Sequence, residues 1–153
     1  MNWQWLAANT GRIVDLSLAH LKIAVPAIVL AFVIAVPLGW AAHRTPRLRE
    51  LIVVASGMVF VVPSLAMFIL MPLVLGTSIL SPLNVVAAMT LYGVALMVRA
   101  AADAFDTVPS SVQQSAIAAG YAPARRVFAV DLPLAGPGLL AGLRVVAAST
   151  ISL

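Results

Sequence analysis

The chain has 153 residues, of which 63% are hydrophobic and only 9% are charged. A water-soluble domain of this length cannot bury so much apolar surface, so the composition excludes an ordinary soluble protein. The chain contains no cysteine, which excludes a disulfide framework and a thiolate metal site. The composition therefore indicates an integral membrane protein.

The formal net charge is +4, and the basic residues are spread along the chain beside apolar stretches rather than gathered in one patch. Such spreading is typical of membrane topology and of contacts with anionic lipid headgroups, so membrane lipid is an expected partner and nucleic acid is not. His20 and His43 lie at opposite ends of the first predicted membrane helix. No shared metal site is expected.

Three membrane helices are predicted in chain order, over about 19–42, 51–75 and 83–102. Residues 23–42 carry no charge, and neither do residues 51–98. About twenty apolar residues make one helical span, so the second stretch is long enough for two. Breaker residues gather at its middle, between Gly76 and Pro82, and predict the turn there. Because no alternating barrel pattern is present, the expected fold is an all-α, polytopic transmembrane helix bundle in a single domain, 1–153.

A helix–turn–helix elbow is predicted over about 103–133. Ser110, with Gln113 three residues later, forms a capping box after Pro109 and predicts a helix start. Gly120 can adopt the left-handed conformation that ends this helix. Pro123 suits the first turn of the next helix, where its missing N–H costs nothing.

The arginines predict the orientation of the chain in the membrane. Arg44, Arg47 and Arg49 crowd the first short loop, and Arg125 and Arg126 lie in the elbow two crossings later. Basic loops face the cytoplasm, so both of these loops are expected there and the turn at 76–82 is expected outside.

The last helix is predicted to start at about residue 145. Arg144 is expected near the polar side of the membrane, which leaves only residues 145–153 for the bilayer. Nine residues with a rise of about 1.5 Å each cannot cross a core of about 30 Å. The sequence thus predicts an incomplete last span and a carboxyl-terminally truncated chain.

Several polar or helix-breaking residues fall within the predicted membrane helices. Freed backbone groups at membrane depth are tolerated only beside protein or a water-filled cavity. Pro63, Ser64, Asn84 and Tyr92 are therefore the candidates for a translocation path. A purely structural role is the alternative for each of them, because prolines are ordinary in membrane helices.

The elbow also carries a recognisable spacing. Gly120 is followed ten residues later by Val130 and then by Leu132-Pro133. This spacing resembles the E-A-A-x3-G-x9-I-x-L-P signature of bacterial ATP-binding-cassette (ABC) importer permeases. In that family the loop is the coupling helix that docks on a cytoplasmic ATPase. The resemblance assigns ATPase coupling to Gln114, Ser115, Ala116 and Gly120, with Leu132 and Pro133 fixing the return to the membrane.

One departure from the signature concerns its first three positions. Gln114, Ser115 and Ala116 stand where the family usually has Glu-Ala-Ala, so the acidic group is absent. Glutamine can still form a hydrogen bond, but a charge-assisted pair would be roughly twice as strong as a neutral one. Docking is therefore expected to rely more on shape.

Further motifs resemble the osmoprotectant branch of these permeases, which imports glycine betaine, choline, carnitine or related quaternary amines. They include Val36-Pro-Leu-Gly and Val62-Pro-Ser-Leu-Ala. Val98-Arg99-Ala-Ala stands where the branch usually has Leu-Arg-Asn-Thr. The resemblance runs over nearly the whole chain.

The resemblance implies a permease subunit that performs no bond chemistry and sits in the bacterial cytoplasmic (inner) membrane. The chain has no phosphate-cradling Gly-x4-Gly-Lys-Ser/Thr sequence, so no cofactor is expected here and ATP and Mg would be bound by a partner subunit. The implied partners are a cytoplasmic ATP-binding-cassette ATPase, a periplasmic or lipoprotein substrate-binding protein, and a second permease copy or homologue.

Three other functions are compatible with parts of the sequence. A permease for amino acids or another small solute is the alternative within the same class. A small multidrug exporter would need an ionisable carboxylate inside the membrane, whereas Asp15 and Glu50 lie at segment edges. A noncatalytic membrane scaffold is the third, and it predicts no co-purifying ATPase.

Overall fold

The computed structural model describes residues 3–62 and 64–152, and each described element is helical. The prediction of an all-α fold is confirmed. In chain order the elements are α1 (Trp3–Arg44), α2 (Pro46–Val61), α3 (Ser64–Leu75), α4 (Pro82–Asp106), α5 (Ser110–Ala118), α6 (Pro123–Arg126), the π-helical turn η1 (Val127–Asp131) and α7 (Leu132–Ser152).

Three of the described helices are long and apolar enough to cross a membrane: Ala7–Arg44, Pro82–Asp106 and Pro123–Ser152. The pair α2 and α3 adds a fourth crossing if the bent pair counts as one span. The apolar stretches of the sequence therefore correspond to helices, as their composition requires in lipid.

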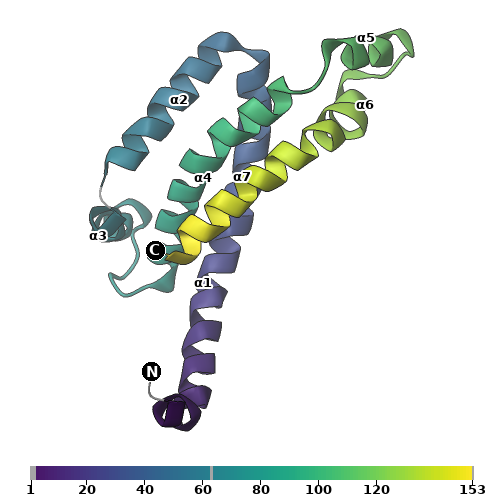
Figure 1. Cartoon of the computed structure of the whole chain (residues 1–153). Helices are drawn as coiled ribbons and strands as arrows, with labels where there is room; N and C mark the ends of the chain where they lie inside the picture. Colours follow the sequence, from purple (N-terminus) through teal and green to yellow (C-terminus); the bar gives the residue numbers. More distant parts are fainter. Residues whose placement is uncertain (1–2, 63, 153) are drawn as a thin grey trace.

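The first helix is longer than predicted. α1 spans Trp3–Arg44, 42 residues, whereas the predicted helix covers about 19–42. Charged side chains at Arg12, Asp15 and Lys22 set a limit on the apolar segment, but they do not end a helix. At 1.5 Å per residue α1 is about 63 Å long, roughly twice the hydrocarbon thickness. Its amino-terminal half projects beyond the other helices (Figure 1).

The second predicted helix, 51–75, is two helices in the structure. The axes of α2 and α3 differ by 105° across a short break. Val62, at the break, is extended, with φ −72° and ψ 123°. A residue that precedes a proline is pushed out of the helical region, which explains why the helix ends there. Pro26, Pro37 and Pro72 lie inside helices that continue through them.

The prediction that the last membrane helix starts near residue 145 is wrong. The helical path runs from Pro123 to Ser152, 30 residues that are long enough to cross a membrane. Arg144 lies on an exposed face of α7 and the helix continues on both sides of it. A long arginine side chain can reach toward a polar boundary while its backbone stays in the membrane, so Arg144 does not mark the start of the span.

The third helix and the elbow also differ from the predicted bounds. α4 spans Pro82–Asp106 rather than about 83–102, and the elbow, formed by α5 and α6, lies between α4 and η1. The alanines that follow Arg99 are good helix formers, so α4 continues to Asp106.

The core lies around α4, which contacts α1, α2, α3 and α7. Small residues let these helices approach closely. A Cβ atom built on Gly39 of α1 would lie 2.5 Å from the Cβ of Ala101, and one on Gly138 of α7 would lie 2.8 Å from the Cβ of Ala104. Such contacts between small residues are the usual basis of helix association in lipid. The same faces bury Met97, Phe105 and Val146.

The turn between α1 and α2 and the elbow formed by α5 and α6 lie at the same end of the bundle (Figure 1). This arrangement brings both arginine-rich segments to one end, as the charge distribution predicted. The turn before α4 lies toward the opposite end, near the carboxyl terminus. We call these the basic end and the opposite end of the bundle.

Candidate functional site

The helix α5 ends in a closed turn that depends on Gly120. Gly120 has a φ of +78°, the left-handed conformation predicted for it. The N–H of Tyr121 donates to the carbonyl of Ala116 at 3.0 Å, and the N–H of Gly120 donates to the carbonyl of Ile117 at 2.9 Å. These two bonds form a Schellman motif, which satisfies the last carbonyls of the helix and fixes the direction of the chain after it.

The start of α5 differs from the predicted capping box. Pro109 is the N-cap residue, with an extended backbone, and no side chain caps the helix. Ser110 is already the first helical residue, so its hydroxyl is not at the capping position. The carbonyl of Pro109 instead accepts from the N–H groups of Val112 and Gln113, at 3.1 and 3.3 Å.

The residues assigned to coupling by the signature do not all share one environment. Gln114, Ser115 and Gly120 are exposed, whereas Ala116 is buried. The Ser115 hydroxyl donates to the carbonyl of Ser111 within α5, at 2.9 Å. Gln114 is thus the long polar side chain that this set presents to solvent, while Ala116 packs inward.

The two residues assigned to the return toward the membrane also differ. Leu132 is half-buried against the main core, whereas Pro133 is exposed. Both lie at the start of α7.

Two large apolar side chains near the elbow were not identified by the signature. Ile117 on α5 is 57% exposed, and Phe128 on η1 is 73% exposed. Ile117 could have been found from the sequence, because a large apolar residue on a short, mostly polar helix outside the membrane indicates a contact surface. Phe128 lies in the π-helical turn, which the sequence did not predict.

The return from the elbow is built on Pro123, which lies in the first turn of α6 as predicted. The guanidinium carbon of Arg125 lies 4.9 Å from the ring centre of Tyr121, a cation–π contact that joins α6 to the closed turn. Within the described part of the chain, Asp131 Oδ1 and Arg126 Nε are buried without a hydrogen-bond partner. The π-helical turn lies between α6 and the membrane helix α7, and π-helical turns are frequent at functional sites.

An ionic network at the basic end ties α1, α2 and α4 together. Nδ1 of His43 donates to Oδ1 of Asp106 at 2.6 Å. The guanidinium of Arg49 donates to Asp106 through one nitrogen and to Oδ1 of Asp103 through the other, at 2.6 Å for the second bond. Asp106 is the last residue of α4, four positions before α5 begins. The network therefore fixes the base from which the elbow projects.

We expect Asp106→Asn to lower the free energy of unfolding by about 1 kcal/mol, since its carboxylate is partly exposed and solvent screens the pairing. The loss should shrink as salt is raised, because salt screens charges near the surface. Thermal unfolding in detergent at low and high salt measures both effects. Asp15→Asn, on the exposed part of α1, is the matched control and should change little. A salt-independent loss would contradict the ionic role.

Asn84, one of the candidates for the translocation path, is buried at the opposite end of the bundle. Its side-chain amide donates to the carbonyl of Ser78 at 2.9 Å, and its oxygen accepts from the hydroxyl of Thr77. These bonds hold the 76–81 turn against the start of α4. The contacts give Asn84 a structural role in the turn.

Tyr92 lies at the break between α2 and α3. Its hydroxyl donates to the carbonyl of Val62, so α4 supplies a partner to a backbone group that the broken helix frees. Ser64 is half-buried at the start of α3. Pro63, the remaining candidate for the path, lies outside the described residues. The sequence predicted a single helix over 51–75 here, and it did not pair Tyr92 with Val62.

Removing the hydroxyl tests that pairing. Tyr92→Phe should lower the free energy of unfolding by about 1–3 kcal/mol, because the Val62 carbonyl loses this donor in an apolar surrounding. Chemical unfolding in detergent measures the change. Tyr121→Phe is the control, since the contact of Tyr121 with Arg125 uses the ring rather than the hydroxyl. Equal stability of the two variants would show that the hydroxyl of Tyr92 is unimportant.

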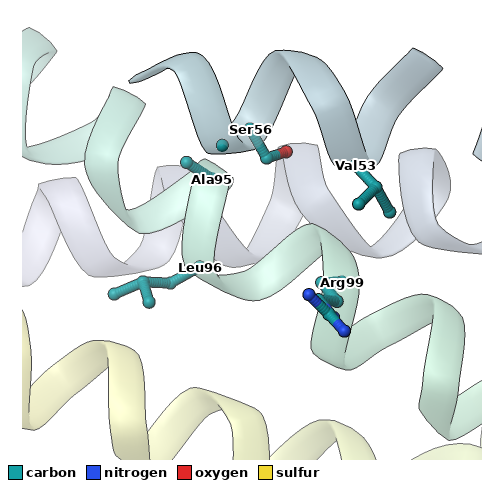
Figure 2. Close-up of a pocket in the computed structure, with 6 residues that line it drawn as sticks. Val53, Ser56, Ala95, Leu96 and Arg99 are labelled. Atoms are coloured by element: carbon teal, nitrogen blue, oxygen red, sulfur yellow. The ribbon is translucent and has the colours of Figure 1, made fainter. Parts of the chain in front are cut away.

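A groove between α2 and α4 brings Arg99 beside small residues. One pocket of about 230 Å³ is lined by Val53, Ser56, Gly57, Ala95, Leu96 and Arg99. Figure 2 shows Arg99 on α4, with Val53 and Ser56 on the neighbouring helix α2. A second pocket of about 270 Å³ shares Val53 and Arg99 with the first and adds Arg49, Glu50, Ala102 and Asp103. We call the two together the Arg99 groove.

The fold and the elbow define a class of membrane permease. Residues 27–153 match the family of binding-protein-dependent transport system inner membrane components, and the chain belongs to this family. This is the family of ABC importer permeases that the elbow resembles.

Among characterised relatives, the chain is similar to the choline transport system permease protein OpuBB of Bacillus subtilis, with 29% identity over 92% of this chain and 64% of the relative. It is 31% identical to the osmoprotectant import permease protein OsmW of Salmonella typhimurium, over 92% and 66% of the two chains. It is 25% identical to the glycine betaine/carnitine/choline transport system permease protein OpuCD of Bacillus subtilis, over 92% and 60%. The chain thus spans just under two thirds of the length of these relatives.

Proposed function

We propose that the chain is the membrane-spanning subunit of an ATP-driven importer for a small osmolyte such as glycine betaine, choline or carnitine. The observation that carries this proposal is the closed turn at Gly120, which sets α5 as a rigid projection at the basic end of a bundle from the permease family. Three relatives named for choline, osmoprotectant or glycine betaine transport support the substrate class.

In the proposed mechanism α5 docks on a cytoplasmic ATPase, which binds ATP and Mg. Closure of the ATPase on ATP moves α5, and the movement passes through Asp106 and its ionic network into α4, the helix that contacts α1, α2, α3 and α7. Two copies of the chain, or one copy and a homologue, enclose a path that opens alternately to either side. A periplasmic or lipid-tethered binding protein delivers the substrate.

The shape of α5 supports docking through contact rather than charge. Gln114 and Ser115 offer neutral polar groups, and Ile117 adds an exposed apolar side chain on the same short helix. α5 itself contains no charged residue. Docking should therefore depend only weakly on salt, because screening acts on charges.

Co-purification with candidate ATPases followed by uptake in proteoliposomes tests the proposal. The chain, its ATPase and its binding protein are reconstituted together, and uptake of radiolabelled glycine betaine and choline is followed with and without ATP. We expect ATP-dependent uptake of at least one of them. An ATPase that co-purifies while amino acids alone are transported would assign the chain to another substrate class. If no ATPase co-purifies, the chain is not an importer subunit.

A further inference from the structure

The pocket of the Arg99 groove that Ser56, Gly57 and Ala95 line contains none of the residues of the elbow or of the ionic network. Ser56, Gly57 and Ala95 are small, and they leave an open space beside the side chain of Arg99. A side chain added at Gly57 would meet nothing within 4 Å, so the space continues around that residue. The groove is therefore an open recess between two membrane helices, and Arg99 is the cation beside its small residues.

Arg99 lies inside the span formed by α4, seven residues before Asp106, which corresponds to about 10 Å along the helix. An arginine at such a depth is costly unless it meets an anion or reaches a polar surface. Asp103, one turn closer to the basic end, is hydrogen-bonded to Arg49 at 2.6 Å. In the described parts of the chain, no carboxylate lies within ion-pair distance of Arg99.

The two pockets of the groove differ in their charged groups. Its inner pocket combines Arg99 with apolar and small residues, and its outer pocket adds Arg49 and the carboxylates of Glu50 and Asp103. Both acidic side chains are exposed. A molecule in the groove thus meets Arg99 beside an apolar wall at one end, and the carboxylate of Glu50 beside the Arg49–Asp103 pair at the other.

Resting on the proposed osmolyte import, we propose that Arg99 binds the carboxylate of a small zwitterionic quaternary amine on its way through the permease, with Glu50 facing the ammonium end. The planar guanidinium holds a carboxylate through two parallel hydrogen bonds. Because Arg49 is already paired with Asp103, Arg99 and Glu50 are the positive and the negative group that the groove offers to a substrate carrying one of each charge. The permease would then contribute to selection, beyond the binding protein.

The comparison of glycine betaine with choline isolates this contact. Both molecules carry a trimethylammonium group, but only glycine betaine carries a carboxylate. A hydrogen bond to a charged partner contributes about 1.5–3 kcal/mol, which corresponds to about a tenfold to hundredfold change. Loss of the guanidinium should therefore affect glycine betaine far more than choline.

The experiment uses the reconstituted complex with its ATPase and binding protein, and it compares Arg99→Gln and Arg99→Lys with Arg47→Gln. Arg47 is an exposed arginine at the basic end that does not line the groove, so its loss controls for charge. We expect Arg99→Gln to lower uptake of glycine betaine about tenfold or more and to leave choline uptake nearly unchanged. Uptake of glycine betaine by Arg99→Lys should fall between the levels of Arg99→Gln and the unmodified chain, because lysine keeps the charge but lacks the paired donors of the guanidinium. Arg47→Gln should match the unmodified chain for both substrates.

Several outcomes would overturn the inference while leaving the import function intact. Equal loss of both substrates in Arg99→Gln would show a structural or gating role. An effect that tracks the fraction of anionic lipid in the vesicles would assign Arg99 to a lipid headgroup. Import of choline alone by the unmodified complex would also refute a carboxylate site. If the unmodified complex imports neither molecule, the result contradicts the proposed function rather than the role of Arg99 alone.

Discussion

Replacing Gly120 with valine is expected to uncouple ATP hydrolysis from uptake. Gly120 has a φ of +78°, a region that costs an ordinary residue about 1–2 kcal/mol and a β-branched residue more. The strain weakens the two hydrogen bonds that close α5, so the helix no longer projects at a fixed angle. We expect uptake to fall about tenfold or more while the partner ATPase continues to hydrolyse ATP in the reconstituted complex.

Asparagine at the same position is the matched control. A Cβ atom at Gly120 would meet nothing within 4 Å, so the effect of a substitution there comes from the backbone conformation and not from a clash. Asparagine tolerates the left-handed region better than other non-glycine residues. Gly120→Asn should keep most of the uptake. Equal uptake in the valine and asparagine variants would show that the closed turn does not govern coupling.

Replacing Gly39 with leucine is expected to prevent the bundle from assembling. A Cβ atom at Gly39 would lie 2.5 Å from the Cβ of Ala101 and 2.9 Å from the backbone nitrogen of Ala102. The backbone of α4 cannot yield as a flexible side chain could, so α1 and α4 would have to separate. Gly39→Ala should already lower the free energy of unfolding by about 1–3 kcal/mol.

Gly11→Ala in the same helix provides the control, because an added Cβ there meets nothing within 4 Å. Alanine is the better helix former, so this variant should gain up to about 1 kcal/mol. Unfolding in detergent, followed by loss of helical signal, measures both variants. A Gly39→Leu protein that folds and elutes like the unmodified chain would contradict the close packing of α1 on α4.

The elements that depend on local chemistry could be predicted from the sequence. Gly120 adopts the left-handed backbone conformation that ends α5, and Pro123 lies in the first turn of α6. The charge-free stretches became helices because lipid leaves the backbone few alternatives. The placement of both arginine-rich segments at one end also followed from the positions of the arginines and the number of predicted crossings between them (Figure 1).

One error concerns the start of the last helix, and another concerns the single helix predicted over 51–75. The sequence predicts that Arg144 lies at the edge of the membrane, yet α7 continues on both sides of Arg144, which lies on an exposed face. Four prolines lie inside helices that continue through them, whereas α2 ends at Val61 and Val62 is extended. What distinguishes that break is a partner from elsewhere in the chain, the hydroxyl of Tyr92.

Contacts between distant segments could not be predicted at all. The network of His43, Arg49, Asp103 and Asp106 joins residues up to 63 positions apart. The spacing of Asp103 and Asp106 places both on one helical face, but it does not reveal which cation they meet. The Arg99 groove likewise forms only when α2 packs beside α4.

Cysteine labelling from the two sides of the membrane tests the orientation on which the proposed coupling depends. The chain has no cysteine, so Ser111→Cys on α5 and Ser78→Cys in the opposite turn each report one exposed site. We expect a membrane-impermeant maleimide to label Ser111→Cys only in inverted vesicles and Ser78→Cys only in intact cells. Labelling of Ser111→Cys from outside the cell would place α5 out of reach of any ATPase and would contradict the proposed function.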